Sequence, residues 1–130
     1  MSLAGYAIVA LATPEAVTAT SNEGAVLVNK YSGEARLTLS SSGGGASTTM
    51  DVKIQHSDDG STGWTDSGVA FQRVENTAYT QSIGVNVDRF KKYIRVAQTV
   101  AGTTPSFVRS VLLVAKEDRS APVPFVPPEA

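Results

Sequence analysis

The strictest pattern in the sequence is the alternation of apolar and polar residues between Met50 and His56. One side of this segment carries Met50, Val52, Ile54 and His56, and the other carries Asp51, Lys53 and Gln55. A period of two predicts a β-strand with one buried and one solvated face. The next residues, 57–63, are rich in Asp, Ser and Gly, which favour a tight turn. We therefore expect a β-hairpin whose return strand follows Trp64, with that side chain packed in the core.

The same kind of pattern recurs along the chain as short apolar or alternating runs. These runs are 5–12, 15–21, 25–28, 34–40, 50–56, 69–71, 79–85, 92–99 and 106–115. Pro14 is expected to end the first strand. Residues 86–90 are expected to form a turn or a single helical turn. The unbroken apolar run Val111–Val114 predicts that the last strand is buried on both faces there.

Many short strands separated by turn residues predict an all-β fold. We expect a single antiparallel β-sandwich, with either jelly-roll or immunoglobulin-like strand order. A chain of 130 residues fits one domain. We place the sandwich at residues 1–119 and an extended Pro-rich C-terminal tail at residues 120–130.

Composition argues against several classes of partner and compartment. The formal net charge is −1, so the strongly basic footprint of a nucleic-acid-binding domain is missing. The apolar run 3–12 has no basic residue before it and is too short to cross a bilayer. We interpret that run as the first strand, and expect a soluble protein made without an export signal, with no membrane partner. The absence of cysteine mildly favours a reducing compartment.

Two segments have the composition of contact elements. The Ser/Gly segment 41–49 is expected to be flexible and solvated, either as a long hairpin connection or as an adaptable contact loop. The segment 121–128 contains four prolines, which favour an extended chain. It is either a disordered tail or an arm that lies on a neighbouring subunit. The candidate contacts in these segments are Ser42, Gly44, Ser47, Pro124, Phe125 and Val126.

No motif for chemistry stands out. His56 is the single histidine, and no cysteine could join it in a metal cluster. Residues 58–62 fail the calcium-loop spacing after the first ligand, and no Gly-x-Ser-x-Gly motif is present. We therefore predict no catalytic, cofactor-binding or metal-binding residue, no cofactor, and no enzymatic activity.

The basic residues Arg89, Lys91, Lys92 and Arg95 form one cluster in the sequence. This cluster is either a solvated rim or a patch that pairs with an acidic partner. We include Arg89, Lys91 and Lys92 among the candidate partner contacts.

Two segments resemble small structural proteins of tailed bacteriophages. The first is the hairpin Val52–Asp66, which contains Ser57-Asp58-Asp59-Gly60 and Trp64-Thr65-Asp66. The second is the strand Lys92-Tyr93-Ile94-Arg95-Val96 with the following Gly102-Thr103-Thr104-Pro105-Ser106-Phe107. The resemblance covers roughly residues 50–115, and Gly63 lengthens the turn by one residue relative to the family pattern.

This resemblance implies a virion component, and specifically a capsid decoration protein that binds and stabilises the outer surface of an assembled phage head. The implied partners are the major capsid protein and further copies of this chain, with a trimer favoured. The implied location is the capsid surface, after synthesis in the host cytoplasm. Two alternatives remain open. One is a tail-tube or head-fibre subunit, and the other is a carbohydrate-binding sandwich that uses Trp64, Tyr79 and Tyr93.

Overall fold

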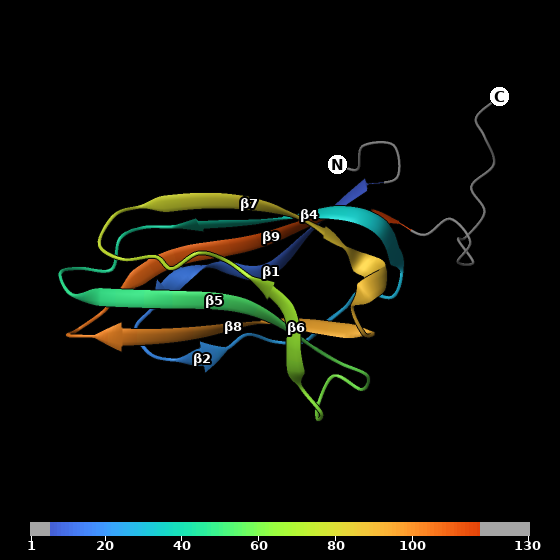
Figure 1. The fold of residues 1–130 in the computed structure, drawn as a ribbon, viewed down its shortest axis with the longest axis horizontal. Helices are drawn as coiled ribbons and strands as arrows, with labels where there is room; N and C mark the ends of the chain where they lie inside the picture. The colour runs from blue at the N-terminus through green and yellow to red at the C-terminus, as the bar shows by residue number, and fades with distance from the viewer. Residues whose placement is uncertain (1–5, 118–130) are drawn as a thin grey trace.

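The computed structural model describes residues 6–117, which form two antiparallel sheets packed face to face (Figure 1). The strands are β1 (Tyr6–Val17), β2 (Ser21–Asn22), β3 (Val26–Leu27), β4 (Tyr31–Ser41), β5 (Thr48–Ser57), β6 (Thr65–Ala70), β7 (Tyr79–Asn86), β8 (Tyr93–Gly102) and β9 (Phe107–Glu117). One short 3-10 helix, η1 (Val87–Arg89), follows β7. The prediction of an all-β sandwich is confirmed.

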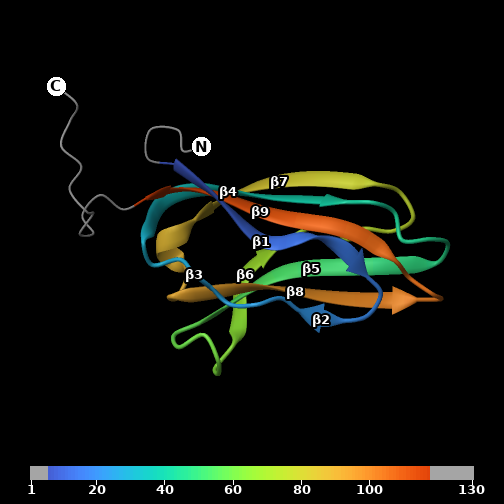
Figure 2. The same cartoon turned by 180° about the vertical axis from the view of Figure 1, so that it is seen from behind.

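The strand order identifies the type of sandwich. The first sheet, called sheet A, has the order β1-β9-β4-β7, and the second, sheet B, has the order β2-β8-β5-β6, with β3 also paired to β8. Figure 2 shows β2 and β3 following one another beside β8, as one interrupted strand. This pair of strand orders is that of a jelly roll rather than an immunoglobulin fold.

The core lies between the sheets and consists of the inward-facing residues that alternation predicts. Met50, Val52 and Ile54 on β5 are all less than 2% exposed. Ile94 and Val96 on β8 belong to the same core cluster as Leu37 and Leu39 on β4, and all four are fully buried. Residues 86–90 contain the expected helical turn, because the Asn86 side chain accepts a hydrogen bond from the Asp88 amide and so caps η1.

The prediction that Pro14 ends the first strand is wrong. Strand β1 continues to Val17, so its last residues include the start of the segment predicted as a separate strand. The ladder to β9 has register shifts between Ala10 and Ala12 and between Ala12 and Glu15. Strand β1 is the edge of sheet A, and an edge with bulges tolerates a residue that has no amide hydrogen.

The expectation of burial on both faces at the end of β9 is also wrong. Val111 and Leu113 are fully buried, but Leu112 between them is 37% exposed. The inner face of β9 meets sheet B, whereas no element of the described chain covers its outer face. The apolar run is therefore a half-buried strand whose outer face is itself apolar.

The boundary proposed at residues 119/120 and the tail beyond it lie outside the described residues, as do Pro124, Phe125 and Val126. Within residues 6–117 no helix is long and apolar enough to cross a membrane.

Candidate functional site

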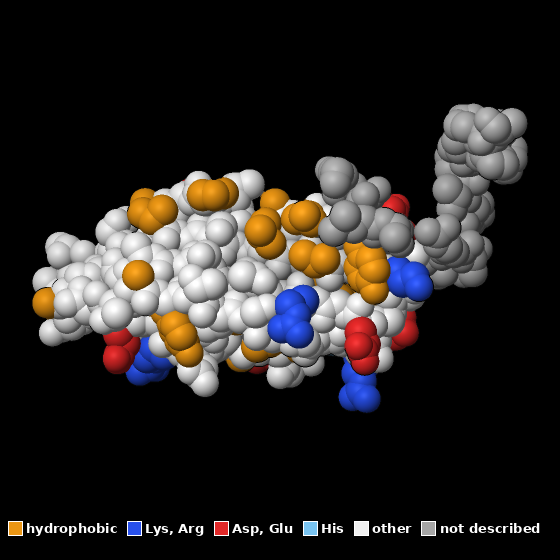
Figure 3. Space-filling model, turned by 90° about the horizontal axis from the view of Figure 1, so that it is seen from above, with side chains coloured by type: hydrophobic (Ala, Val, Ile, Leu, Met, Phe, Trp, Pro, Cys, Tyr) orange, Lys and Arg blue, Asp and Glu red, His pale blue; other side chains and the backbone are white. Residues whose placement is uncertain are grey.

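The most distinctive surface of the molecule is a row of exposed apolar side chains on the outer face of sheet A. We call this row the apolar stripe; it consists of Tyr6 and Ile8 on β1 and Val108 and Leu112 on β9. Their exposed fractions are 42%, 64%, 52% and 37%. Strands β1 and β9 are hydrogen-bonded neighbours, so the four side chains share one face. Figure 3 views the molecule from this side and shows hydrophobic groups on a largely uncharged surface.

The other half of the same face carries hydroxyl groups. Thr38 and Ser40 on β4 lie opposite Ser82 and Thr80 on β7, at oxygen–oxygen distances of 3.3 and 3.1 Å. Arg36 donates to the Ser82 hydroxyl at 3.2 Å. Sheet A therefore presents an outer face that combines apolar groups with neutral hydrogen-bonding groups, a composition suited to a protein contact.

Both ends of the described chain meet at one end of the apolar stripe. Tyr6 pairs with Lys116 in the β1–β9 ladder, and Glu117 is the last residue of β9. The segments before Tyr6 and after Glu117 therefore start from adjacent strands of sheet A.

The outer face of sheet B has a different character, because its charged side chains are paired with one another. Asp66 accepts hydrogen bonds from Lys53 and Gln55, each at 3.1 Å. Gln55 in turn accepts from Arg95, whose guanidinium stacks on the Trp64 ring at 4.4 Å. The Gln55 and Lys53 side chains hold the pKa of Asp66 below its ordinary value. The prediction that Trp64 packs in the core is wrong, since it forms a cation–π contact on this outer face.

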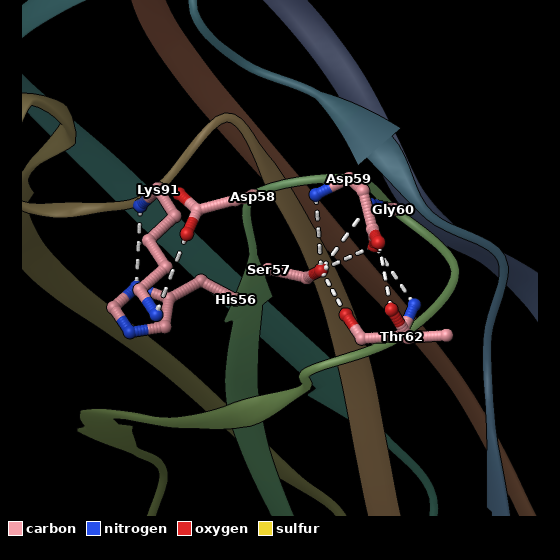
Figure 4. A network of polar contacts seen from close by, with 7 residues as sticks. All are labelled: His56, Ser57, Asp58, Asp59, Gly60, Thr62 and Lys91. Carbon is pink, nitrogen blue, oxygen red and sulfur yellow. Dashed lines mark hydrogen bonds and ion pairs between the residues drawn. The ribbon is translucent and has the colours of Figure 1, made fainter.

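The β5–β6 turn is held by a network of short-range hydrogen bonds (Figure 4). The hydroxyl of Ser57, which is fully buried, accepts from the amides of Asp59 and Gly60. The Asp59 carboxylate accepts from the Thr62 hydroxyl at 2.7 Å and from the Thr62 and Ser61 amides at 2.8 and 2.9 Å. These bonds, led by the Thr62 hydroxyl, lower the pKa of Asp59 far below its ordinary range. The predicted turn is confirmed, and its carboxylate is used within the turn.

The predicted basic cluster is divided between two places. Arg89, Lys91 and Lys92 are exposed at the end of η1, and the Lys91 amide donates to His56 Nδ1 at 3.3 Å. The Lys91 ammonium lies 3.9 Å from Asp58, as Figure 4 shows. Arg95 is instead part of the sheet B network. Burial, and secondarily the charge of Lys91, lower the pKa of His56, with Asp58 acting against them.

The Ser/Gly segment differs from the flexible, solvated loop that the sequence predicts. Ser42 forms two hydrogen bonds with Val108 of β9: its amide donates to the Val108 carbonyl at 2.9 Å, and its side-chain hydroxyl accepts from the Val108 amide at 3.0 Å. Gly44 is buried, and a Cβ atom there would overlap the Phe107 ring. Ser47 is exposed in the turn directly before β5. Small residues are required here because the loop packs on the core. Contact of Ser42, Gly44 and Ser47 with a partner stays a prediction.

Arg109 on β9 forms a buried ionic network that the sequence analysis missed. Its side chain has no solvent exposure and donates to Glu23 at 2.6 Å, to Glu15 at 3.3 Å and to Gln98 at 2.8 Å. Gln98 also donates to Glu23 at 2.7 Å, so the network joins β1, the β2–β3 connection and β8 to β9. The available signal was the position of Arg109 two residues after Phe107, on the inner side of an alternating strand.

A cavity of about 950 Å³ opens beside the end of β7. Its lining includes Val69 from β6, Val85 from β7 and Phe90 after η1, with Glu34, Arg36 and Arg89 at polar positions. The aromatic residues of the carbohydrate hypothesis do not line it together. Tyr79 lies on β7 of sheet A and bonds Gln72, whereas Trp64 and Tyr93 belong to the sheet B side.

Among residues 6–117, no group of three or more His, Asp or Glu side chains is placed to hold a metal ion.

Comparison with known proteins finds similar folds in viral and prophage proteins. No protein-family model matches the sequence, and no curated protein matches it. A chain in the structure of infectious bursal disease virus, Gt strain, superposes with a TM-score of 0.60 at 9% identity, covering 90% of this chain and 33% of that chain. The VP2 subviral particle of the same virus gives a TM-score of 0.53 at 11% identity, with 86% and 32% covered.

A protein of matching length also has this fold. The SPBc2 prophage-derived protein YomS superposes with a TM-score of 0.51 at 16% identity, covering 88% of this chain and 98% of that chain. By contrast, this chain spans about a third of the viral chains that it matches. At these identities the likeness concerns the fold alone. The protein is a jelly-roll β-sandwich similar in fold to chains of a virus particle and to a prophage protein.

Proposed function

We propose that this protein is a non-enzymatic structural subunit of a tailed-phage virion, and specifically a decoration protein that binds the outer surface of the assembled head. The observation that carries the proposal is the outer face of sheet A, where four large apolar side chains lie exposed beside neutral hydroxyl groups. Burial of such a face against protein is favourable, because apolar area leaves water while the hydroxyls find partners.

The proposed mechanism is stabilisation by binding. A ligand that binds the closed shell but not its separated subunits shifts the equilibrium toward the closed shell. Weak binding by each subunit is sufficient to stabilise the shell when many copies bind together around a symmetric particle. The partners are the major capsid protein and further copies of this chain, and the location is the capsid surface.

The fold and the sequence resemblance support this proposal from different sides. The jelly-roll fold recurs in the VP2 subviral particle and in a prophage-derived protein. The hairpin and the Lys92–Val96 strand that carry the phage resemblance form β5, β6 and β8, which are adjacent in sheet B. A basic corner at Arg89, Lys91 and Lys92 and the exposed Ser47 offer further contacts to an acidic shell surface.

The test is the location and copy number of the chain in virus particles. Heads and tails are separated, and this chain is quantified in each fraction by mass spectrometry against the major capsid protein. A simple, high ratio to the capsid protein in heads is the expected result. Many copies in the tail fraction would instead assign the chain to a tail tube, and its absence from both fractions would refute the virion proposal.

A further inference from the structure

We infer that the apolar stripe of each subunit receives the Pro-rich C-terminal segment, residues 121–128, of a second copy of the chain. This inference rests on the proposed function to the extent that both require a self-associating structural protein. It names the occupant of the stripe, which the proposed function leaves open.

The chemistry of the stripe and of the segment is complementary. The stripe offers an exposed aromatic ring, Tyr6, together with the aliphatic side chains of Ile8, Val108 and Leu112. The segment Ala121-Pro122-Val123-Pro124-Phe125-Val126-Pro127-Pro128 has no charged residue. Pro-rich segments bind to exposed aromatic surfaces with a small entropic cost, because their extended conformation is already restricted. Prolines would also prevent the segment from continuing β9 as a central strand.

The lengths agree as well. The stripe runs along β9 from the Tyr6–Lys116 pair back to Val108, which is eight residue steps or about 27 Å at the rise of a β-strand. Eight residues of polyproline conformation, 121–128, span about 25 Å. One segment can therefore cover one stripe.

The direction of the chain favours a second copy over the subunit's own stripe. Strand β9 ends at Glu117, and the stripe lies behind that point, along the residues that precede it. To cover its own stripe, the chain would have to reverse and also rise to a new layer about 10 Å above the sheet. The three residues 118–120 reach only about 10 Å when fully extended, so the rise alone consumes them. A segment that continues forward onto a neighbouring subunit needs no reversal.

Such an exchange generates a closed oligomer. When each subunit gives its segment to the next, the contacts are head-to-tail, and they close as a ring where the rotation between neighbours allows it; the expected trimer is one such ring.

Site-specific disulfide cross-linking of the full-length chain tests the inference, because the protein has no cysteine of its own. One variant carries Ile8→Cys on the stripe and another carries Phe125→Cys. The two are refolded together, oxidised and separated on a non-reducing gel. A matched control replaces Ile8→Cys with Thr99→Cys, which is exposed on the outer face of sheet B opposite Asp51.

The expected result is a cross-linked pair from Ile8→Cys with Phe125→Cys, in at least severalfold excess over the Thr99→Cys control. Three results would overturn the inference. They are no cross-link above the control, an internal disulfide in single chains of a third variant that carries both Ile8→Cys and Phe125→Cys, and efficient pairing of Ile8→Cys with itself. The last two would assign the stripe to the chain's own tail or to a second stripe.

Sedimentation gives a second measurement on the intact fold. Phe125→Ser is expected to shift the full-length protein from oligomer to monomer, whereas Glu129→Gln, just beyond the segment, leaves the mass unchanged. Unchanged mass in both variants contradicts the inference. Neither outcome depends on whether the chain is found in heads or tails, so a failure here and a failure of the proposed function can be told apart.

Discussion

The two outer faces of the sandwich are built from the same kind of alternating strand, yet they differ in whether their side chains already have interaction partners within the chain. On sheet B, Lys53, Asp66, Gln55 and Arg95 bond one another, and Trp64 is stacked under Arg95. On sheet A, the apolar stripe has no covering group among residues 6–117. A face whose polar groups are already paired gains little from a partner, whereas an exposed apolar row gains by being covered. We therefore assign contact to sheet A and solvent to sheet B.

Strand β9 shows the same difference within two adjacent residues. Val108 is 52% exposed on the outer face, and Arg109 is 1% exposed on the inner face. The usual placement of apolar and charged residues is inverted at this point. The inversion is stable because every described partner of Arg109 is a carboxylate, an amide or a carbonyl oxygen.

The largest effect on stability is expected from Arg109→Met. It leaves the Glu23 carboxylate, whose side chain is 20% exposed, without its cation, and should lower the free energy of unfolding by about 3 kcal/mol. The matched control is Arg73→Met, which breaks the exposed Arg73–Asp51 pair and should cost far less than Arg109→Met, because solvent already screens the two charges. Urea denaturation measures both variants. Equal losses would contradict the distinction between the inner network and the outer pairs.

Gly44→Ala is expected to have the next largest effect. Its Cβ atom would overlap the Phe107 ring, and overpacking of this kind costs about 2 kcal/mol. Gly84→Ala on the outer face of β7 is the control, since no atom lies within 4 Å of the added methyl group. We expect Gly84→Ala to be neutral or slightly stabilising in the same denaturation experiment. An unchanged free energy of unfolding in Gly44→Ala would contradict this packing and would show that the loop moves to accommodate the methyl group, as expected of a flexible contact loop.

Variants on the outer faces should separate assembly from stability. Leu112→Ser on the apolar stripe is expected to lower the free energy of unfolding by about 1 kcal/mol, because the side chain is only 37% exposed, and also to lower the oligomer mass in sedimentation. Asp66→Asn on sheet B is expected to leave that mass unchanged. Loss of assembly in Asp66→Asn, with none in Leu112→Ser, would reverse the assignment of the two faces.

The smallest effect is expected from the pH dependence of His56. Burial and Lys91 lower its pKa in the folded state, so the neutral form is favoured by folding. The corresponding stability is fully present above the unfolded pKa of about 6.5 and is lost as the pH falls through the lower folded pKa. Denaturation midpoints should therefore decrease from pH 7.5 to pH 5.5, and His56→Gln should reduce that slope. A midpoint that rises toward pH 5.5 would contradict the direction of the shift.

Much of the fold could be predicted from the sequence, because alternation at Met50–His56 and Lys92–Thr99 specifies which side chains face inward. The jelly-roll strand order could not be predicted from the sequence, because strand pairing is set by contacts between segments that are distant in the chain. The end of the first strand was predicted wrongly at Pro14, because a proline at a bulged sheet edge does not end a strand.

The candidate site was only partly accessible to sequence analysis. The apolar residues on both sides of Leu112 predict that it is buried in the core, and only the structure shows that no described element covers it. From its residue type, Arg109 is expected at the surface. Its burial depends on four hydrogen-bond acceptors that come from three other parts of the chain, and the sequence does not show that these parts meet. The predicted contacts at Ser42 and Gly44 followed from composition, whereas their packing on β9 depends on long-range geometry.

The measurement that tests the central claim most directly is side-chain footprinting of the chain on intact particles. Hydroxyl-radical labelling is compared between the chain in purified heads and the chain dispersed as monomer. The account predicts strong protection of Tyr6, Ile8 and Leu112 on sheet A, with little change at Trp64 on sheet B. Equal labelling of the apolar stripe in both states, or protection confined to sheet B, would contradict the account.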